Sequence, residues 1–196
     1  MKKVSVYKTE GIIIKAADLG ELDRLLFVYT RGYGKITVRA ISTRKKESKL
    51  RGVLETFSRG ELMLAKSKTI DIVTDFQVSD SYAYVHKNLE NLAYAYYFAE
   101  LVDKLIPAPE RDEDIWRLVS RVFEVLNHPT PTLPLIKGRG KGGVNLQEAF
   151  EDKLLEFLGH PKPAKLGRNS SLQRLNYLQS LAGEQINSAK FLGQII

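Results

Sequence analysis

Residues 35–39 read KITVR, in which polar side chains alternate strictly with apolar ones. Successive side chains of a β-strand point to opposite faces, so this period predicts a half-buried strand with Lys35 and Arg39 on its solvent face. The alternation returns over residues 70–78, IDIVTDFQV, where every second side chain is apolar or threonine. The two segments predict strands, and the first has a cationic solvent face.

Three more runs complete this pattern in the first 80 residues. Residues 4–15 are rich in β-branched side chains, and residues 25–30 form a short apolar run closed by the turn sequence GYG at 32–34. Residues 61–65 form the third run. Five short strands with no long helix between them predict a small β-barrel.

The character of the sequence changes near residue 80, where apolar side chains begin to recur at helical spacing. The residues SDS at 79–81 supply candidate helix N-caps, and Pro107 and Pro109 end the first long helix. The expected fold class is therefore α+β with two domains, a five-stranded barrel over residues 1–80 and an all-α domain over residues 81–196. Further helices are predicted from Asp112 to Leu126, Leu146 to Leu158, Leu172 to Leu181 and Gln185 to Leu192.

Positive charge is concentrated in one part of the chain. The 196 residues contain 30 Lys and Arg against 23 Asp and Glu, a net charge of +7. Residues 31–68 alone hold eleven basic and three acidic side chains, so this segment carries the whole positive balance. Such asymmetry favours a polyanionic partner, and the alternative is a solvated basic face with no specific partner.

Composition narrows the class of protein further. Hydrophobic residues make up 43% of the chain and no apolar run approaches the roughly 20 residues of a membrane span, so we expect a globular protein without a membrane role. The first residues lack the apolar stretch of a signal peptide. Cysteine is absent, which excludes disulfides, thiolate nucleophiles and cysteine-based zinc sites in this chain and favours a cytoplasmic location.

No catalytic arrangement is visible in the sequence. His86, His128 and His160 lie far apart, and none has a metal-ligand partner at helical spacing. The acidic pair Glu21 and Asp23 flanks a predicted turn beside Arg24 and is typical of turn or salt-bridge residues, and the acidic residues 112–114 stand at a helix start, where negative charge is favoured. We therefore expect no enzyme, no metal and no small-molecule substrate.

Residues 138–143, GRGKGG, satisfy the pattern G-x-G-x-x-G. A dinucleotide-binding loop requires a strand directly before the first glycine, whereas the residues here follow a proline-rich connection. A flexible basic loop is the better interpretation, with Arg139 and Lys141 as candidate phosphate contacts.

The strongest functional candidate is the basic segment between the third and fourth predicted strands, residues 43–52, TRKKESKLRG. A loop in this position can follow a nucleic-acid backbone along a barrel groove, and such contacts neutralise phosphates without reading bases. The candidate DNA-binding residues are Lys35, Arg39, Arg44, Lys45, Lys46, Lys49 and Arg51. Three nearby aromatic residues are candidates for stacking on bases: Tyr29, Tyr33 and Phe57.

Several motifs occur in the order found in a bacterial family, the RecO recombination mediators. The sequence resembles that family at residues 10–15 (EGIIIK), 18–24 (DLGELDR), 48–52 (SKLRG) and 93–105 (AYAYYFAELVDKL), and more loosely at 154–159 (LLEFLG). The resemblance implies an N-terminal OB-fold and a C-terminal helical domain. It also implies a non-enzymatic role in homologous recombination and DNA repair.

Proteins of the RecO family bind single- and double-stranded DNA, anneal complementary strands, contact single-strand-binding protein and work with RecR to help load RecA. The resemblance therefore implies these partners for this chain, and a cytoplasmic, nucleoid-associated location. Many members carry a four-cysteine zinc module after the helix that ends here near Gly159; this chain has no cysteine, so we expect no zinc and a shortened C-terminal region. Leu19 also replaces the aromatic residue expected between Asp18 and Gly20.

Two other functions remain open at this point. An OB-fold groove accepts RNA as well as DNA, so a general RNA- or single-strand-binding module is one alternative. A protein adaptor whose basic loop meets an acidic partner is the other, and it predicts no salt-dependent binding of nucleic acid.

Overall fold

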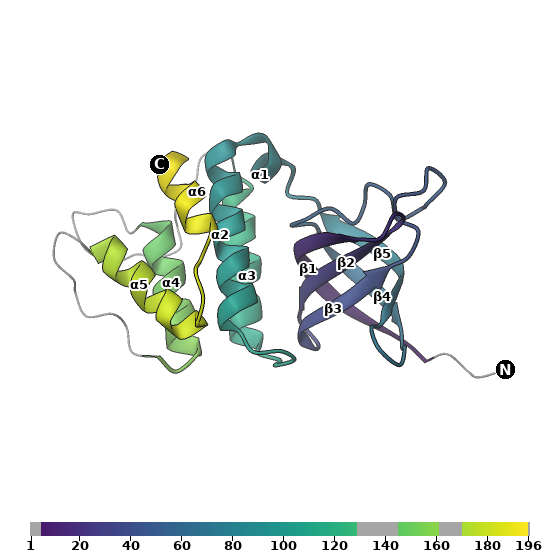
Figure 1. Ribbon diagram of the computed structural model, residues 1–196, viewed down its shortest axis with the longest axis horizontal. Helices are drawn as coiled ribbons and strands as arrows, with labels where there is room; N and C mark the ends of the chain where they lie inside the picture. Colours follow the sequence, from purple (N-terminus) through teal and green to yellow (C-terminus); the bar gives the residue numbers. More distant parts are fainter. Residues whose placement is uncertain (1–4, 129–144, 161–169, 196) are drawn as a thin grey trace. The chain divides into compact units, whose positions relative to one another are not determined.

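The computed structural model describes residues 5–128, 145–160 and 170–195 (Figure 1). In these residues five strands are followed by six helices, as the α+β prediction requires. The chain forms two compact units. The barrel unit contains the residues up to Ala83 together with Ile106–Trp116, and the helical unit contains Tyr84–Leu105 and the residues from Arg117 onward.

The five predicted strands are present, with ends shifted by a few residues. The largest change is in the first strand, which extends four residues beyond Lys15 because its second half pairs with the strand that follows. The strands are β1 (Val6–Leu19), β2 (Asp23–Thr30), β3 (Gly34–Ala40), β4 (Arg59–Ala65) and β5 (Ile72–Asp80).

The strands close into a barrel in the order β1-β2-β3-β5-β4. Neighbouring strands are antiparallel except for β3 and β5, which meet in parallel where Arg39 pairs with Ile72. The long strand β1 pairs with β2 through one half and with β4 through the other, and this closes the barrel. A five-stranded barrel with this connectivity is an OB-fold, which confirms the predicted fold class.

Side chains that point inward from all five strands fill the barrel, as the period of two in the sequence predicts. Leu54, in the connection between β3 and β4, joins them and is 1% exposed, so part of this loop is anchored in the core. The buried core consists of Ile13, Leu26, Val28, Val38, Ala40, Leu54, Leu62, Leu64, Val73 and Phe76.

The helices lie close to their predicted positions, with one difference at the start. The single helix expected after residue 80 is interrupted at Asn88, whose side chain accepts a hydrogen bond from the backbone N–H of Asn91 at 2.9 Å and so caps the second of two helices. The helices are α1 (Ala83–Lys87), α2 (Leu89–Leu105), α3 (Glu113–Leu126), α4 (Leu146–Phe157), α5 (Ser170–Ala182) and α6 (Ser188–Ile195).

Helix α2 is the centre of the helical unit, as its wide apolar arc predicts. The buried face is centred on Tyr97 and Phe98, and the Phe98 ring lies 4.4 Å from that of Phe150 on α4. Leu89 and Tyr96, on the same helix, are 60% and 46% exposed. No described helix is long and apolar enough to cross a bilayer.

Candidate nucleic-acid interface

The basic segment lies in the connection between β3 and β4, which we call the basic loop (residues 41–58). It extends from one end of the barrel in Figure 1. Its backbone turns repeatedly, because the N–H groups of Lys45, Ser48 and Arg51 each donate to the carbonyl three residues earlier, at 3.1 to 3.2 Å. These turns present a closely spaced set of long cationic side chains to solvent.

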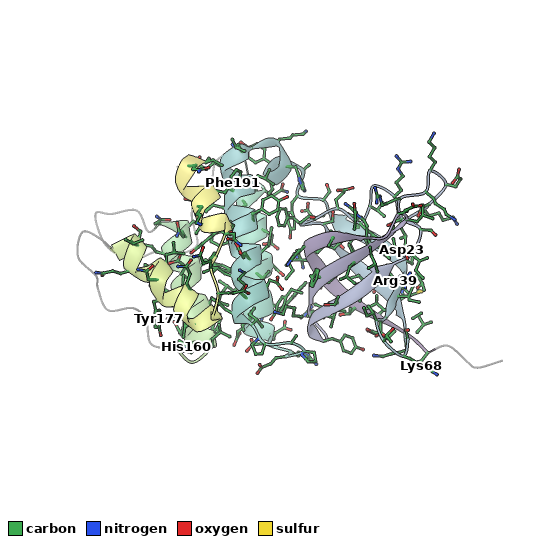
Figure 2. All side chains as sticks on the ribbon, in the orientation of Figure 1. Asp23, Arg39, Lys68, His160, Tyr177 and Phe191 are labelled. Atoms are coloured by element: carbon green, nitrogen blue, oxygen red, sulfur yellow. The ribbon has the colours of Figure 1, made fainter. Side chains whose placement is uncertain are left out.

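Asp23, at the start of β2, fixes the point where the loop leaves β3. Its carboxylate accepts a hydrogen bond from Arg39 Nε at 2.9 Å and another from the backbone N–H of Ser42 at 2.7 Å. Figure 2 shows Asp23 and Arg39 side by side on the barrel. The Ser42 hydrogen bond and the Arg39 guanidinium hold the pKa of Asp23 below its ordinary value, so this anchor is ionised at neutral pH.

The predicted cations differ in how far they are already paired. Arg39 is bound to Asp23, and Arg44 lies 3.4 Å from Asp18. Four others are exposed, and in the described part of the chain their side chains form no ion pair: Lys45, Lys46, Lys49 and Arg51. Lys45 is still close enough to Asp23 to help lower the pKa of that carboxyl.

Lys35 stands apart from this group. It is only partly exposed, at the opposite end of β3 from the basic loop, where it pairs with Tyr29 of β2. Seven residues of β3 span about 20 Å, so the structure separates Lys35 from the loop cations.

An open hollow of about 430 Å³ lies between the base of the basic loop and the end of β1. Arg24, Arg44 and Arg51 face it, with Asp18 and Glu55 as the acidic members of its lining. Three guanidinium groups against two carboxylates leave one positive charge, and guanidinium groups suit phosphate oxygens because they donate in a planar fork.

Arg24 is a member of this site that the sequence prediction missed. Its side chain donates to the carbonyl of Leu54 in the basic loop at 3.3 Å. The sequence does contain a feature that predicts this position of Arg24. The tight turn at 32–34 sets the register of β2 against β3, and this register places Arg24 opposite Ala40, directly before the basic loop.

The stacking prediction is wrong for two of the three aromatic residues. Tyr29 and Phe57 are both completely buried, so neither ring has a face for a base. Tyr29 packs against Trp116 of α3 with ring centroids 6.3 Å apart, and Phe57 is part of the hydrophobic interior. Tyr33 is 42% exposed. Stacking by Tyr33 stays a prediction.

The remaining candidates give no second site. Arg139 and Lys141 lie outside the described residues. No cluster of three or more His, Cys, Asp or Glu side chains in the described ranges could hold a metal ion. The acidic residues at 112–114 belong to a helix start, as predicted, since Asp112 accepts hydrogen bonds from the backbone of Asp114 and Ile115 at 2.8 Å.

Comparison with known proteins decides the family. The family model described as Recombination protein O N terminal matches residues 1–82, and the model described as Recombination protein O C terminal matches residues 86–137. The chain belongs to the RecO family. The two models correspond to the barrel and to the first helices of a RecO-type chain, as the sequence motifs predicted.

Several curated relatives are named DNA repair protein RecO. The protein of Pelotomaculum thermopropionicum is 30% identical over 157 residues, which cover 80% of this chain and 57% of the relative. The protein of Moorella thermoacetica is 29% identical, over 79% of this chain and 53% of the relative. The protein of a Roseiflexus species is 37% identical, over 62% of this chain and 43% of the relative. This RecO-family chain spans about half the length of the curated relatives it matches.

Proposed function

We propose that this chain acts in DNA repair as a non-enzymatic mediator that binds single- and double-stranded DNA through the basic loop and promotes annealing of complementary strands. The observation that carries the proposal is the set of four exposed loop cations that form no ion pair in the described residues, on an OB-fold of the RecO family. Cations that are not neutralised within the protein are available to phosphates.

Electrostatics can account for annealing without ATP. Two complementary strands repel each other through their phosphates, and a cluster of Lys and Arg side chains reduces that repulsion while releasing condensed counterions. The loop contacts phosphates and not base edges, so binding is expected to be independent of sequence. The Arg24, Arg44 and Arg51 hollow adds a place where one phosphate sits between guanidinium groups.

The partners implied by the family complete the proposal. We propose that the helical unit recruits single-strand-binding protein and RecR, and that the chain thereby helps RecA to load on covered DNA in the bacterial cytoplasm. We propose that no cofactor takes part; in particular, the chain has no cysteine to bind zinc as a four-cysteine module does. Treatment with a chelator is then expected to leave DNA binding unchanged.

The test is a salt series with a fluorescent single-stranded oligonucleotide, in which annealing is followed in the same samples. The variant Lys45→Glu/Lys46→Glu/Lys49→Glu removes three phosphate contacts, so log Kd should depend on log salt with a slope smaller by about 2. At low salt we expect binding weaker by on the order of a hundredfold, and loss of annealing.

A matched control separates the loop from net charge. The variant Lys87→Glu/Arg121→Glu/Lys190→Glu makes the same charge change on exposed residues of the helical unit. If both variants weaken binding equally, the basic loop is not the binding surface. If the wild-type chain binds no DNA at low salt, the proposal as a whole is wrong, and matched RNA oligonucleotides decide whether RNA is the ligand.

A further inference from the structure

The barrel carries a second surface, which we call the aromatic cluster (Tyr7, Tyr33 and Lys66). Its Tyr33 lies at the end of β3 opposite the basic loop. Tyr7 stands near the start of β1, Tyr33 lies in the hairpin between β2 and β3, and Lys66 begins the hairpin between β4 and β5. The Tyr7 and Tyr33 rings meet edge to face, with centroids 4.8 Å apart and an interplanar angle of 68°. Lys66 Nζ lies 4.6 Å from the centre of the Tyr7 ring.

One carboxylate holds this cluster together. The Tyr7 hydroxyl donates to Asp71 Oδ2 at 2.7 Å, and Lys66 Nζ lies 3.2 Å from the same oxygen. Asp71 also accepts from the backbone N–H of Ser67 at 2.9 Å, which ties the β4–β5 hairpin to the cluster. Burial and the bond to Asp71 raise the pKa of Tyr7, so its hydroxyl stays a donor at neutral pH.

The hairpin that carries Tyr33 is fixed by hydrogen bonds that its backbone N–H groups donate to residues of β1 and β2. Arg31 N–H donates to the Glu10 carbonyl at 2.9 Å, Gly32 N–H to Thr9 Oγ1 at 3.3 Å, and Tyr33 N–H to Thr30 Oγ1 at 3.1 Å. A ring on such a hairpin loses little conformational entropy when it binds a ligand.

The cluster combines exposure with cationic surroundings. Tyr33 is 42% exposed, and the Lys66 side chain is 57% exposed. Lys68 is exposed in the same hairpin, and Figure 2 places it well away from Asp23 and Arg39. An exposed aromatic ring beside lysines is the combination by which proteins bind single-stranded nucleic acid without sequence preference.

We propose that the aromatic cluster is a second contact for single-stranded nucleic acid, in which a base stacks on Tyr33 while the exposed Lys68 meets a neighbouring phosphate. Lys66, which is paired with Asp71, holds the Tyr7 ring against Tyr33. This inference rests on the proposed function. It adds a contact of a different kind, because the basic loop recognises only phosphates and the aromatic cluster requires a base. Tyr33 and the basic loop lie at opposite ends of β3, about 20 Å apart, so a strand that contacts both would extend along the barrel.

The test compares two oligonucleotides of about 12 nucleotides, a length within the usual range for one OB-fold. One is oligothymidine, and the other is an abasic strand of equal length and charge. Tyr33→Ala should weaken binding of oligothymidine about five- to tenfold and leave its salt slope unchanged, because a stacked base is lost and no phosphate contact is. Binding of the abasic strand should not change. Tyr33→Trp should retain the affinity for oligothymidine.

Tyr96→Ala is the matched control, since Tyr96 is a tyrosine of similar exposure on α2 of the helical unit, and it should bind like the wild type. Circular dichroism melting confirms that each variant is folded. The inference is overturned if Tyr33→Ala binds both oligonucleotides like the wild type, or weakens binding of both to the same extent; the cluster would then be free for another role, such as protein contact. Failure of the wild type to bind either strand would overturn the proposed function as well.

Discussion

On the basic loop, four cationic side chains reach solvent without forming an ion pair in the described chain, whereas in the helical unit the buried Glu151 is paired with Arg174. The Glu151 side chain is 2% exposed and accepts hydrogen bonds from Tyr97 Oη at 2.7 Å, Gln147 Nε2 at 2.8 Å and Arg174 Nε at 3.0 Å. Arg174 also pairs with Asp152. In the helical unit, charged side chains are therefore paired with other residues of the protein, whereas on the basic loop they remain available to a ligand.

The difference shows how charged residues divide between folding and binding. A buried charge costs several kcal/mol of desolvation unless every lone pair has a partner, so removing one member exposes that cost. An exposed lysine is already solvated by water, so its removal costs the fold almost nothing. Charged residues that form no ion pair are therefore the candidates for binding a ligand, and charged residues with several partners are the candidates for stabilising the fold.

The largest effect on stability is expected from Glu151→Ala. It leaves the Arg174 guanidinium without its most buried partner and the Tyr97 hydroxyl without an acceptor. We expect the free energy of unfolding of the full chain in urea to fall by about 3 kcal/mol. Glu148→Ala, on the exposed face of the same helix, is the control and should change it by less than about 0.5 kcal/mol. Equal effects of the two variants would show that the cluster does not stabilise the unit.

The next largest effect is expected in the pH dependence of stability, through the ionisation of Glu151. Burial raises the pKa of Glu151, and the hydrogen bonds from Tyr97, Gln147 and Arg174 oppose that rise. When the pKa of a carboxyl is higher in the folded state than in the unfolded state, the free energy of unfolding of the protein falls as pH rises from the unfolded-state pKa through the folded-state pKa. Arg174→Met removes a group that opposes the rise, so it should destabilise the chain more at pH 7 than at pH 5, by about 1–2 kcal/mol.

The measurement is urea unfolding of the wild type and of Arg174→Met at both pH values. The variant Glu151→Gln/Arg174→Met cannot titrate at residue 151, so it should lose the extra pH dependence. If it keeps that dependence, a different group is responsible.

Asp23→Ala is expected to have a smaller effect, which is confined to the local stability of the basic loop. The substitution removes the acceptor for Ser42 N–H and for Arg39, which together fix the start of the loop. Trypsin should cleave within residues 41–58 about fivefold faster, because cleavage follows the population of the open loop. Glu21→Ala changes an exposed acid in the adjacent turn and should leave the cleavage rate unchanged. If the cleavage rate of Asp23→Ala is unchanged, the basic loop is kept closed by the burial of Leu54 and by the backbone hydrogen bonds of its turns instead of by Asp23.

The sequence predicted what depends on local periodicity. Alternation located β3 and β5, and short apolar or β-branched runs located the other three strands. Lys35, Thr37 and Arg39 face outward from β3 while Val38 is buried, as the period of two requires. Helical spacing located the central helix α2. These features are decided within a few residues of chain, so they can be read without knowing what the segment packs against.

Features that depend on distant segments were missed or wrong. Tyr29 has its hydroxyl-bearing ring covered by Trp116, which is 87 positions away in the chain, and nothing near Tyr29 indicates this. Asp23 was predicted to be a turn or salt-bridge residue and does form a salt bridge, but the sequence did not indicate its partner, Arg39 across the β2–β3 pair. The basic loop was found because its charge excess is visible in the sequence itself, whereas the pairing that leaves some of its cations free required the structure.

The smallest effect on stability is expected from Lys45→Ala/Lys46→Ala/Lys49→Ala, and this variant completes the comparison with Glu151→Ala. All three side chains are exposed, and none forms an ion pair among the residues that the structure describes. The free energy of unfolding should therefore change by less than about 0.5 kcal/mol per residue, while the salt slope for single-stranded DNA falls by about 2. Urea unfolding and a salt titration of the same preparation measure both quantities. A loss of stability comparable to that of Glu151→Ala would mean that these lysines support the fold, and the separation between charges that fold the chain and charges that bind DNA would not hold.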